Sequence, residues 1–591
     1  MKRAILFTAL AMAVMASLAA SPSPSNKATP DRLVIEEPTF CCLGVEWFVK
    51  GDDNRNAIVE FHYRKAGDSQ WREAMPLWQV DATGWIRKVP AGEELFAGSI
   101  FNLEQGTPYE MKLNLRDPDG GEAEKIVTAT TRVEPILPKN GRIRYVVPGD
   151  GGGFGTKADP FKSLKAADAA AQPGDIIKLA PGTYKGAVTL TKSGAPGKPI
   201  VWLGPADNSA IVDGDGGAIA VTADGLQQVW FWHLSITNAE SAITAQKSSY
   251  MVVRYCHISK TENGFTSTHN PAKGNVVLDS VFEGWVPWTL NGERLTYPEV
   301  VFNYKGKRYD YTNIVGVNAT GEGTVVAFNR MTSWGDGIHG SGDQPKCAQD
   351  FYNNEISESA DDGIECDEGA QNIRCFENRM TNCFQGISFQ PVHGGPIYVF
   401  RNAIYNSSHC PFKLENNPHG ILLINNSTLR AAGAEDGCMP IYGGAPVYHV
   451  WVGNNLFAGG DDSSAIHFSP RPNGVSFDYN GYAGGPWKNF AEWAGTTYPT
   501  LAAFQKATKQ EEHAVTMPLK GLFASGATYP ESIDTIAPLS ANDLRLASGT
   551  PAIDAGWVFP GITDGYKGKA PDLGAYELGS ELPHYGPRAE K

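Results

Sequence analysis

The sequence predicts an all-β protein in which a small antiparallel β-sandwich precedes a long solenoid of stacked coils. Two observations lead to this prediction. Short stretches of alternating apolar and polar residues, separated by turn sequences, fill about a hundred residues near the N-terminus. Further on, a motif centred on an apolar residue returns at steps of 26, 23 and 25 residues, at Ile338, Ile364, Ile387 and Phe412. Steps of this size are typical of repeats in which each coil lies on the previous one.

The first residues have the pattern of a secretory leader. Lys2 and Arg3 precede an apolar run that ends in small residues near Ala20, which predicts a signal peptide over residues 1–20. Residues 21–32 form a Ser/Pro/Asn-rich linker rather than the flank of a membrane anchor. We therefore expect a secreted or periplasmic protein with no membrane span.

Composition restricts the classes of partner. The chain has 591 residues, 65 of them Gly, and a net charge of −14. This acidity excludes nucleic acid as the expected partner, because phosphate binding requires Lys/Arg stripes. It does not exclude an acidic polysaccharide, since a bound cation can reverse the local charge. The pairing of the nine Cys stays open, and we expect a monomer.

Residues 33–133 are predicted to form the sandwich. Residues 57–63 and 109–115 alternate, and the turn sequence 117–120 follows the second stretch. The corner at residues 106–109 resembles that of fibronectin type III domains, which implies a fibronectin-III-like β-sandwich. Such a module could bind carbohydrate or serve as a spacer, and the lack of an evident aromatic row favours the spacer.

Residues 140–480 are predicted to form the solenoid. Residues 160–171 read as a short amphipathic helix that covers its open end. The run from 174 to 201 resembles the opening of right-handed parallel β-helix polysaccharide lyases, which implies that architecture. Asparagines recur at steps of 25, 24, 24 and 24 and predict an internal hydrogen-bonded ladder: Asn329, Asn354, Asn378, Asn402 and Asn426.

Two segments depart from the repeat. Residues 285–311 are rich in aromatic side chains, which could stack on sugar rings or form a small core of their own. Residues 481–591 are predicted to be a C-terminal extension. It contains a short helix at 498–506 and a capping segment at 552–577.

Carboxylates gather on the outer face of two adjacent coils. Glu365 and Asp367 are the outward positions of the coil of Ile364. With three residues that stand two or three positions before Ile338 and Ile364, five carboxylates fall on these coils: Asp336, Asp361, Asp362, Glu365 and Asp367. Such proximity without a cation would force protonation or cost several kcal/mol of repulsion. Hard oxygen ligands in this number suit Ca²⁺. We expect Asp336, Asp361, Asp362 and Glu365 to hold it.

Further polar residues are expected on the same face. Lys413 is the candidate catalytic base, with Glu365 and Asp367 as further catalytic candidates. Lys413 could instead form a salt bridge to Glu415 or to the acidic cluster. Residues expected to contact substrate are His339, Gln390, His393, Glu415, His467 and Arg471.

This cluster resembles that of the pectate lyases of polysaccharide lyase family nine. Asp336 matches the first acidic coil of that family, Asp361 and Asp362 match its acidic pair, and Glu365 replaces the last aspartate. The lysine of residues 411–414 matches the family's base. The sequence departs from the family by an additional coil at 372–395 and by Pro411 and Glu415 around the lysine. The resemblance implies calcium-assisted β-elimination on an acidic, uronic-acid-containing polysaccharide.

Two other functions fit the same residues. An inverting glycoside hydrolase would use Asp336, Asp361 and Asp362, or Glu365 or Asp367 as the acid, although Gln385 stands where polygalacturonases have histidine. A non-catalytic glycan-binding β-helix would use the face without chemistry. The sequence leaves the sugar, and endo or exo action, open.

Overall fold

A computed structural model describes residues 25–590 apart from 82–88, 90–92, 270, 291–292, 295–300, 305–306, 311–312, 341–345, 432–438, 443–445 and 461–463. The predicted signal peptide and the first residues of the linker lie outside the described residues. Within the described part, no helix is long and apolar enough to cross a membrane.

In its described residues, the N-terminal part consists of two four-stranded antiparallel sheets. One sheet contains β1 (Thr29–Ile35), β2 (Leu43–Lys50), β6 (Glu93–Ile100) and β5 (Trp78–Gln79); the other contains β4 (Arg72–Glu73), β3 (Ile58–Lys65), β7 (Pro108–Arg116) and β8 (Ala123–Thr130). Burial alternates along β7, as the pleat requires when one face meets a core. Trp47, Phe61 and Leu113 fill that core. The arrangement is consistent with the predicted β-sandwich.

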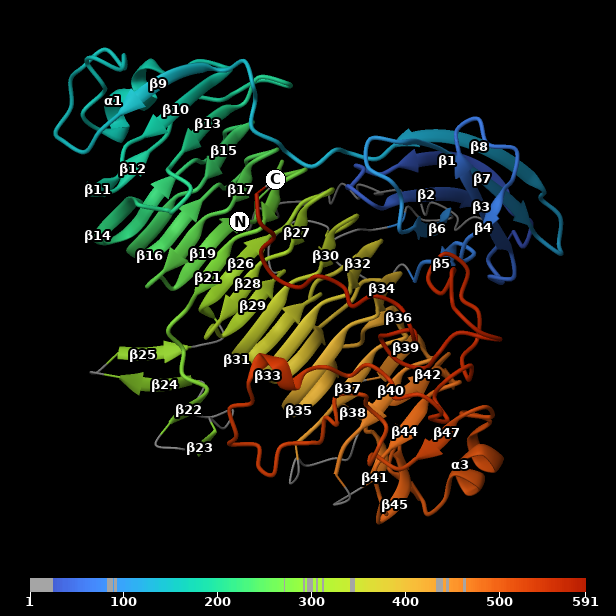
Figure 1. Ribbon diagram of the computed structural model, residues 1–591. Helices are drawn as coiled ribbons and strands as arrows, with labels where there is room; N and C mark the ends of the chain where they lie inside the picture. Colours follow the sequence, from blue (N-terminus) through green and yellow to red (C-terminus); the bar gives the residue numbers. More distant parts are fainter. Residues whose placement is uncertain are drawn as a thin grey trace, which may run out of the picture.

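The larger part is a solenoid of two long, mainly parallel sheets (Figure 1). Among the described residues the first has fourteen strands: β9 (Arg142–Val146), β10 (Asp175–Leu179), β13 (Ile200–Leu203), β15 (Val229–Trp232), β17 (Val252–Arg254), β20 (Val276–Leu278), β27 (Val325–Ala327), β30 (Asp350–Tyr352), β32 (Ile373–Phe376), β34 (Ile397–Phe400), β36 (His419–Ile424), β39 (Pro446–Gly453), β42 (Arg471–Asn473) and β43 (Ser476–Asp478). We call it the fourteen-stranded sheet.

The second, called the twenty-one-stranded sheet, contains in the described part β11 (Gly182–Lys185), β12 (Val188–Thr189), β14 (Ala210–Thr222), β16 (Ser235–Thr244), β18 (His257–Ser259), β19 (Asn263–Ser267), β21 (Val281–Glu283), β26 (Val315–Ala319), β28 (Arg330–Thr332), β29 (Asp336–His339), β31 (Glu355–Glu365), β33 (Arg379–Phe389), β35 (Ala403–Leu414), β37 (Ser427–Leu429), β38 (Met439–Tyr442), β40 (Leu456–Ala458), β41 (Ser464–Phe468), β44 (Gly481–Ala483), β45 (Asn489–Trp493), β46 (Thr496–Tyr498) and β47 (Val515–Met517). The chain alternates between the two sheets, so each coil lies on its predecessor. The predicted all-β fold with a parallel solenoid is confirmed.

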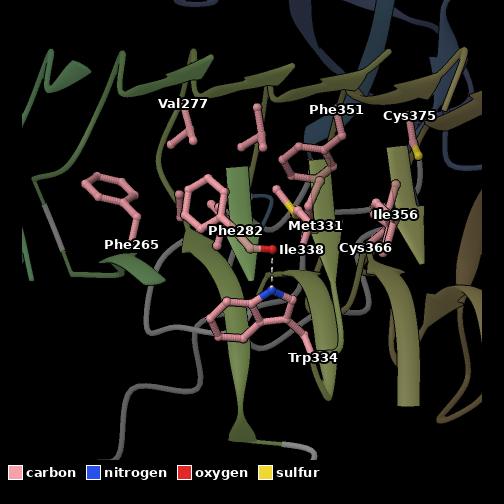
Figure 2. Packing of buried hydrophobic residues seen from close by; sticks show 14 of the residues in the cluster. Phe265, Val277, Phe282, Met331, Trp334, Ile338, Phe351, Ile356, Cys366 and Cys375 are labelled. Atoms are coloured by element: carbon pink, nitrogen blue, oxygen red, sulfur yellow. Dashed lines mark hydrogen bonds between the residues drawn. The ribbon is translucent and has the colours of Figure 1, made fainter. Parts of the chain in front are cut away.

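The apolar column that defines the repeat fills the solenoid interior. Ile338 pairs with Ile364, Ile364 with Ile387, and Ile387 with Phe412, and each is at most 1% exposed. Figure 2 shows Ile338 and Ile356 among the buried side chains, and the indole of Trp334 donates to the carbonyl of Phe282 at 3.2 Å. The predicted inward positions are therefore confirmed.

The asparagine ladder is also confirmed. Each side-chain amide donates to the side-chain oxygen one coil further on, at 3.1 Å from Asn329 to Asn354 and 3.0 Å from Asn354 to Asn378. The ladder continues beyond the predicted residues through Asn455 to Asn480. There it ends on the buried carboxyl group of Glu511, at 2.8 Å. These bonds satisfy buried backbone groups at the turns as well.

Two short helices lie toward opposite ends of the stack (Figure 1). The first, α1 (Leu164–Ala170), is N-capped by Ser163, and the second, α3 (Leu501–Thr508), is N-capped by Thr500. Both fall where the sequence predicts them. A 3₁₀ turn, η2 (Leu539–Ala541), precedes the tail, which follows the solenoid as the red segment in Figure 1. Near the C-terminus Arg588 pairs with Asp279 and Glu134.

The aromatic-rich insertion contains two hairpins in its described part. They are β22 (Thr289–Leu290) with β23 (Glu293–Arg294), and β24 (Val301–Tyr304) with β25 (Lys307–Asp310). Its other residues between 291 and 312 lie outside the described residues. Elsewhere, Cys366 and Cys375 are buried free thiols in the solenoid core, as alternation predicts for Cys366.

The sandwich packs against the fourteen-stranded sheet. The ring of Phe101 meets Tyr398 at 4.9 Å and Phe400 at 5.1 Å between centroids. Close by, Arg374 and Asp350 form a fully buried ion pair at 2.5 Å. Arg374 also donates to Ser99 Oγ of the sandwich at 3.3 Å, so both apolar and polar contacts join the two parts.

Candidate functional site

Four stacked strands, β29, β31, β33 and β35, hold the candidate site on the twenty-one-stranded sheet. Glu365 pairs with Ser388, and Ser388 pairs with Lys413, so these three side chains form one outward row. His339 enters the same row because it follows Ile338, which pairs with Ile364. Residues up to 74 positions apart, from 339 to 413, thereby share one surface.

Glycines beside this row explain the repeated Asp-Gly-Ile pattern. A Cβ on Gly337 would lie 2.7 Å from the carbonyl oxygen of Gly363, and one on Gly363 would lie 2.8 Å from that of Gly386. Both separations are shorter than any real Cβ contact, so the coils could not stack this closely with a side chain here. The pattern therefore reflects packing as well as turn formation.

Three predicted carboxylates meet in one group. One oxygen from each of Asp336, Asp361 and Asp362 lies within 4.8 Å of the others. The backbone N–H of Asp362 donates to Asp336 Oδ1 at 3.0 Å, which fixes the two coils relative to each other. Asp336 and Asp362 are fully buried and Asp361 is 5% exposed. Burial, together with the neighbouring Glu365 carboxylate, raises the pKa of Asp336 well above the usual range.

Lys413 contacts this group directly. Its Nζ lies 3.0 Å from Asp362 Oδ2, and the lysine is 8% exposed. Burial alone would lower the pKa of Lys413, but the charges of Asp362 and Asp367 outweigh it and raise that pKa above its ordinary value. The predicted salt bridge to the acidic cluster therefore forms, and Lys413 is an ammonium group in this geometry.

Glu365 is engaged by His339 rather than by the three-carboxylate group. His339 Nδ1 contacts Glu365 Oε2 and lies 3.2 Å from Asp336 Oδ2. Burial opposes a charged imidazole, but the Glu365 carboxylate raises the pKa of His339 to about 10. The same contact lowers the pKa of Glu365 against the effect of burial. His339, predicted as a substrate contact, is thus the counter-ion of a predicted metal ligand.

Asp367 lies two residues beyond Glu365 on the same coil, just after the end of β31. Its Oδ1 accepts hydrogen bonds from Ser388 Oγ and from the backbone N–H of Gln390, both at 2.7 Å. Burial and the nearby Glu365 charge raise the pKa of Asp367 to about 7. This carboxyl group can therefore exchange a proton near neutral pH.

Two basic residues at the site were not predicted. Lys346 is fully buried, donates to the backbone oxygen of Asp367, and has its pKa lowered by burial to about 8. Arg294, from the insertion, lies over the rings of Phe384 at 4.4 Å and Trp288 at 4.6 Å. Burial lowers the pKa of Arg294 to about 9, against the opposing charge of Asp361. Both come from connections outside the repeat, where spacing gives no register.

Of the other predicted substrate contacts, two lie away from their predicted positions: His467 and Arg471. His393 follows β33 in a turn, and its Nε2 lies 2.8 Å from Glu368 Oε2. Glu415 follows β35, and its N–H donates to Phe389 O. His467 pairs with Pro440, because Phe468 rather than Ile466 pairs with Ile441 of the apolar column. The predicted register of that coil is therefore wrong by two residues.

Arg471 requires a further correction. It lies on β42, which pairs with β39 in the fourteen-stranded sheet, and it is exposed. The acidic cluster belongs to the other sheet. Arg471 is therefore not on the predicted face, because the chain turns between the two sheets just before it.

The three-carboxylate group has the chemistry of a divalent cation site. It offers oxygen ligands, which Ca²⁺ prefers. Asp362 Oδ1 is buried and accepts no hydrogen bond from the described residues, so one oxygen is available to a ligand. Among the described residues, the five carboxyl groups of the cluster outnumber its four basic side chains, and this excess is accompanied by raised pKa values of Asp336 and Asp367. A cation at this group would balance that excess.

Comparison with known proteins finds no matching family model and no matching curated protein. Among solved structures the chain is similar to pectate lyase Pel9A, with 19% identity, a TM-score of 0.40, and coverage of 74% of this chain and 96% of that one. It is also similar to XylC in complex with xylose (10% identity, TM-score 0.44, coverage 74% and 98%). An alginate lyase from Paenibacillus sp. str. FPU-7 is similar with 15% identity and a TM-score of 0.29, over 45% of this chain and 90% of that one. The function proposed below rests on the geometry of the site.

Proposed function

We propose that the protein is a secreted or periplasmic polysaccharide lyase that cleaves a uronic-acid-containing polymer by β-elimination with the help of Ca²⁺. The observation that supports this most is the position of Lys413. Its amine lies 3.0 Å from Asp362, a member of the three-carboxylate group. A potential proton acceptor therefore stands beside a potential cation site, which is the pairing that elimination next to a carboxylate requires.

Asp336, Asp361 and Asp362 would hold the cation. When bound, a divalent cation supplies positive charge that binds a substrate carboxylate and makes the proton on the adjacent carbon more acidic. Asp336 is already fixed by the N–H of Asp362 and by His339, so the group needs little rearrangement. Burial of these side chains strengthens their electrostatic effects.

Lys413 is the residue proposed to take the proton. As long as Asp362 faces it, the carboxylate keeps Lys413 protonated. A neutral amine therefore requires that the charge of Asp362 be balanced by another cation. Burial of the lysine then favours the neutral form. Glu365, paired with His339, is left as a fixed charge in the row. Gln390 and Glu415 directly follow β33 and β35.

A glycoside hydrolase is the second candidate, supported by Asp367. Its pKa of about 7 suits a general acid, with Glu365 as the second carboxylate. Asp336, Asp361 and Asp362 fit this function less well. Their oxygens lie within 4.8 Å of one another, whereas inverting hydrolases separate their carboxyl groups by about 6.5–9.5 Å to admit water.

A polysaccharide panel distinguishes these functions. Acidic and neutral polymers are incubated with the protein, with and without EDTA, and both the ultraviolet absorbance of unsaturated products and new reducing ends are measured. The lyase predicts absorbance from an acidic polymer, abolished by EDTA and restored by Ca²⁺. Reducing ends without absorbance would establish hydrolysis, and neither signal would leave a glycan-binding role.

A further inference from the structure

A pocket lies on the fourteen-stranded sheet, away from the strands that carry the acidic cluster. It has a volume of about 340 Å³ and is formed by β39, β43 and the segments around His513 and Trp557. The pocket is mostly apolar but is edged by Ser476, Asp478 and His513. No residue of the candidate site described above contributes to it.

Aromatic rings form the walls of this pocket. Trp557 is 56% exposed and Trp451 is 37% exposed, both unusually high for tryptophan. Tyr479 stacks on His513 at 4.3 Å and 11°, and lies 5.5 Å from Trp557. The pocket therefore presents flat, partly exposed aromatic surfaces, which suit the apolar faces of sugar rings.

The rings are held in place without a ligand. The backbone N–H and carbonyl of Trp557 both bond the side chain of the buried Asn454 at 2.7 Å. Trp451 packs edge-on against Trp78 of the sandwich at 5.6 Å. A preformed wall loses little conformational entropy on binding, so even a small contact area can yield measurable affinity.

The polar edge suits neutral hydroxyl groups. Asp478 accepts hydrogen bonds from the N–H groups of Tyr479 and His513 and from His513 Nδ1 at 2.8 Å. Its side chain stays 33% exposed and that of His513 54% exposed. A carboxylate at the edge can accept bonds from sugar hydroxyls but repels a uronate. This pocket therefore favours a neutral sugar, whereas the catalytic face is proposed to bind an acidic one.

We infer that this pocket is a binding subsite for a neutral sugar unit of a polysaccharide, separate from the catalytic face. Trp557 and Tyr479 would stack on the ring, and Asp478 with His513 would bind its hydroxyl groups. The subsite would anchor a polymer that carries neutral residues or side chains. Its existence does not depend on the chemistry proposed for Lys413.

Affinity electrophoresis of the full chain tests this inference. The gels contain soluble xylan, galactomannan, hydroxyethyl cellulose or polygalacturonate, and each variant also carries Lys413→Arg so that the polymer stays intact. We expect at least one neutral polymer to retard migration, and Trp557→Ala to weaken this retention about tenfold or more. Val558→Ala, at an exposed neighbouring position outside the pocket, is the matched control and should not change it.

A second substitution tests the charge argument. Neutral polymers should still retard the Asp478→Asn variant. Polygalacturonate should retard it more than the parent protein, because the repulsion between Asp478 and the uronate carboxylates is removed. If Trp557→Ala disturbs folding in a thermal melt, Trp451→Ala replaces it. Unchanged retention in the tryptophan variants, or no retention by any neutral polymer, would overturn the inference. Self-association that depends on Trp557 would do so as well, by making the pocket a protein interface.

Discussion

Lys413 must be charged in one state of the proposed reaction and neutral in another. The structure accounts for the charged state, because Asp362 lies 3.0 Å away and no water separates the pair. Arginine can keep this contact but cannot lose its proton in a protein. The two roles of Lys413, counter-ion and base, can therefore be separated by a single substitution.

Lys413→Arg should preserve folding and abolish catalysis. We expect kcat on an acidic polymer to fall by about 10²–10⁴-fold, the usual contribution of a general base. The melting temperature should change little because Asp362 keeps a cation partner. Lys413→Met removes that partner and should lower both activity and stability. Full activity in the arginine variant would show that Lys413 is not the base.

Single residues also show why the site could be predicted only in part. Asp336, Asp361 and Asp362 were found because they stand just before Ile338 and Ile364, and the repeat places these two coils side by side. Glu365 belongs to the same coil as Asp362, but which partner it takes depends on the rotamer of His339, and spacing cannot reveal a rotamer. Lys346 and Arg294 reach the site from connections of irregular length, so no periodic signal marks them.

At the scale of elements, the asparagine ladder is the most regular polar feature of the solenoid. In its middle, Asn378 accepts from Asn354 at 3.0 Å and donates to Asn402 at 3.0 Å and to Phe351 O at 2.9 Å. All these groups are buried. Removal of the Asn378 side chain leaves its hydrogen-bond partners on both adjacent coils unpaired.

Asn378→Ala should therefore lower the free energy of unfolding by about 3–5 kcal/mol, since each orphaned buried group costs about 1–3 kcal/mol. Urea denaturation followed by circular dichroism measures this change. Asn473→Ala, at an exposed strand position, is the control and should change stability by less than about 0.5 kcal/mol. Equal effects of the two substitutions would contradict a stabilising ladder.

The carboxyl group at the end of the ladder makes the free energy of unfolding depend on pH. Glu511 is fully buried, accepts from Tyr482 at 2.6 Å, and burial raises its pKa from the ordinary 4.5 to about 7. Because the folded state binds this proton more tightly, the contribution to stability is full below about pH 4.5 and declines as pH rises to about 7. Over this range the free energy of unfolding falls by about 3 kcal/mol because of Glu511.

Glu511→Gln should remove this decline, since the amide keeps an oxygen for Tyr482 and does not ionise. Unfolding free energies measured from pH 4.5 to 8 should fall less steeply in this variant than in the wild type. Glu512→Gln, next to it and exposed, should keep the wild-type slope. A glutamine variant at 511 with an unchanged slope would assign the dependence to other groups.

Coil register marks the limit of prediction at this scale. The apolar column could be read from Ile338 to Phe412 because coils of 23–26 residues leave little choice of pairing. Beyond Phe412 the coil lengthens to the 29 residues that separate Phe412 from Ile441. A longer coil permits several registers with apolar residues inside, and sequence pattern alone selected Ile466 where the structure uses Phe468.

At the scale of the whole molecule, the sandwich and the solenoid share an interface that neither sequence segment reveals. Tyr398 and Phe400 lie in β34, whose four residues, Ile397–Phe400, are all apolar and buried, so the sequence does not show which of them meet the sandwich. Arg374 and Asp350 of the solenoid form a fully buried pair, and Arg374 also donates to Ser99 of the sandwich at 3.3 Å. Separation would expose both the rings and the ions, so the two parts should unfold as one cooperative unit.

Phe101→Ala tests this coupling. The substitution removes a ring that is 1% exposed and contacts Tyr398 and Phe400, and it should lower the free energy of unfolding by about 3–5 kcal/mol. Differential scanning calorimetry should give one transition for the wild type and a lower or split transition for the variant. Ile126→Ala, at a 49% exposed position of β8 in the sandwich, should leave the profile unchanged. Two well-separated transitions in the wild type would mean that the sandwich is tethered rather than packed, and the Phe101 variant would then lower only the transition of the sandwich.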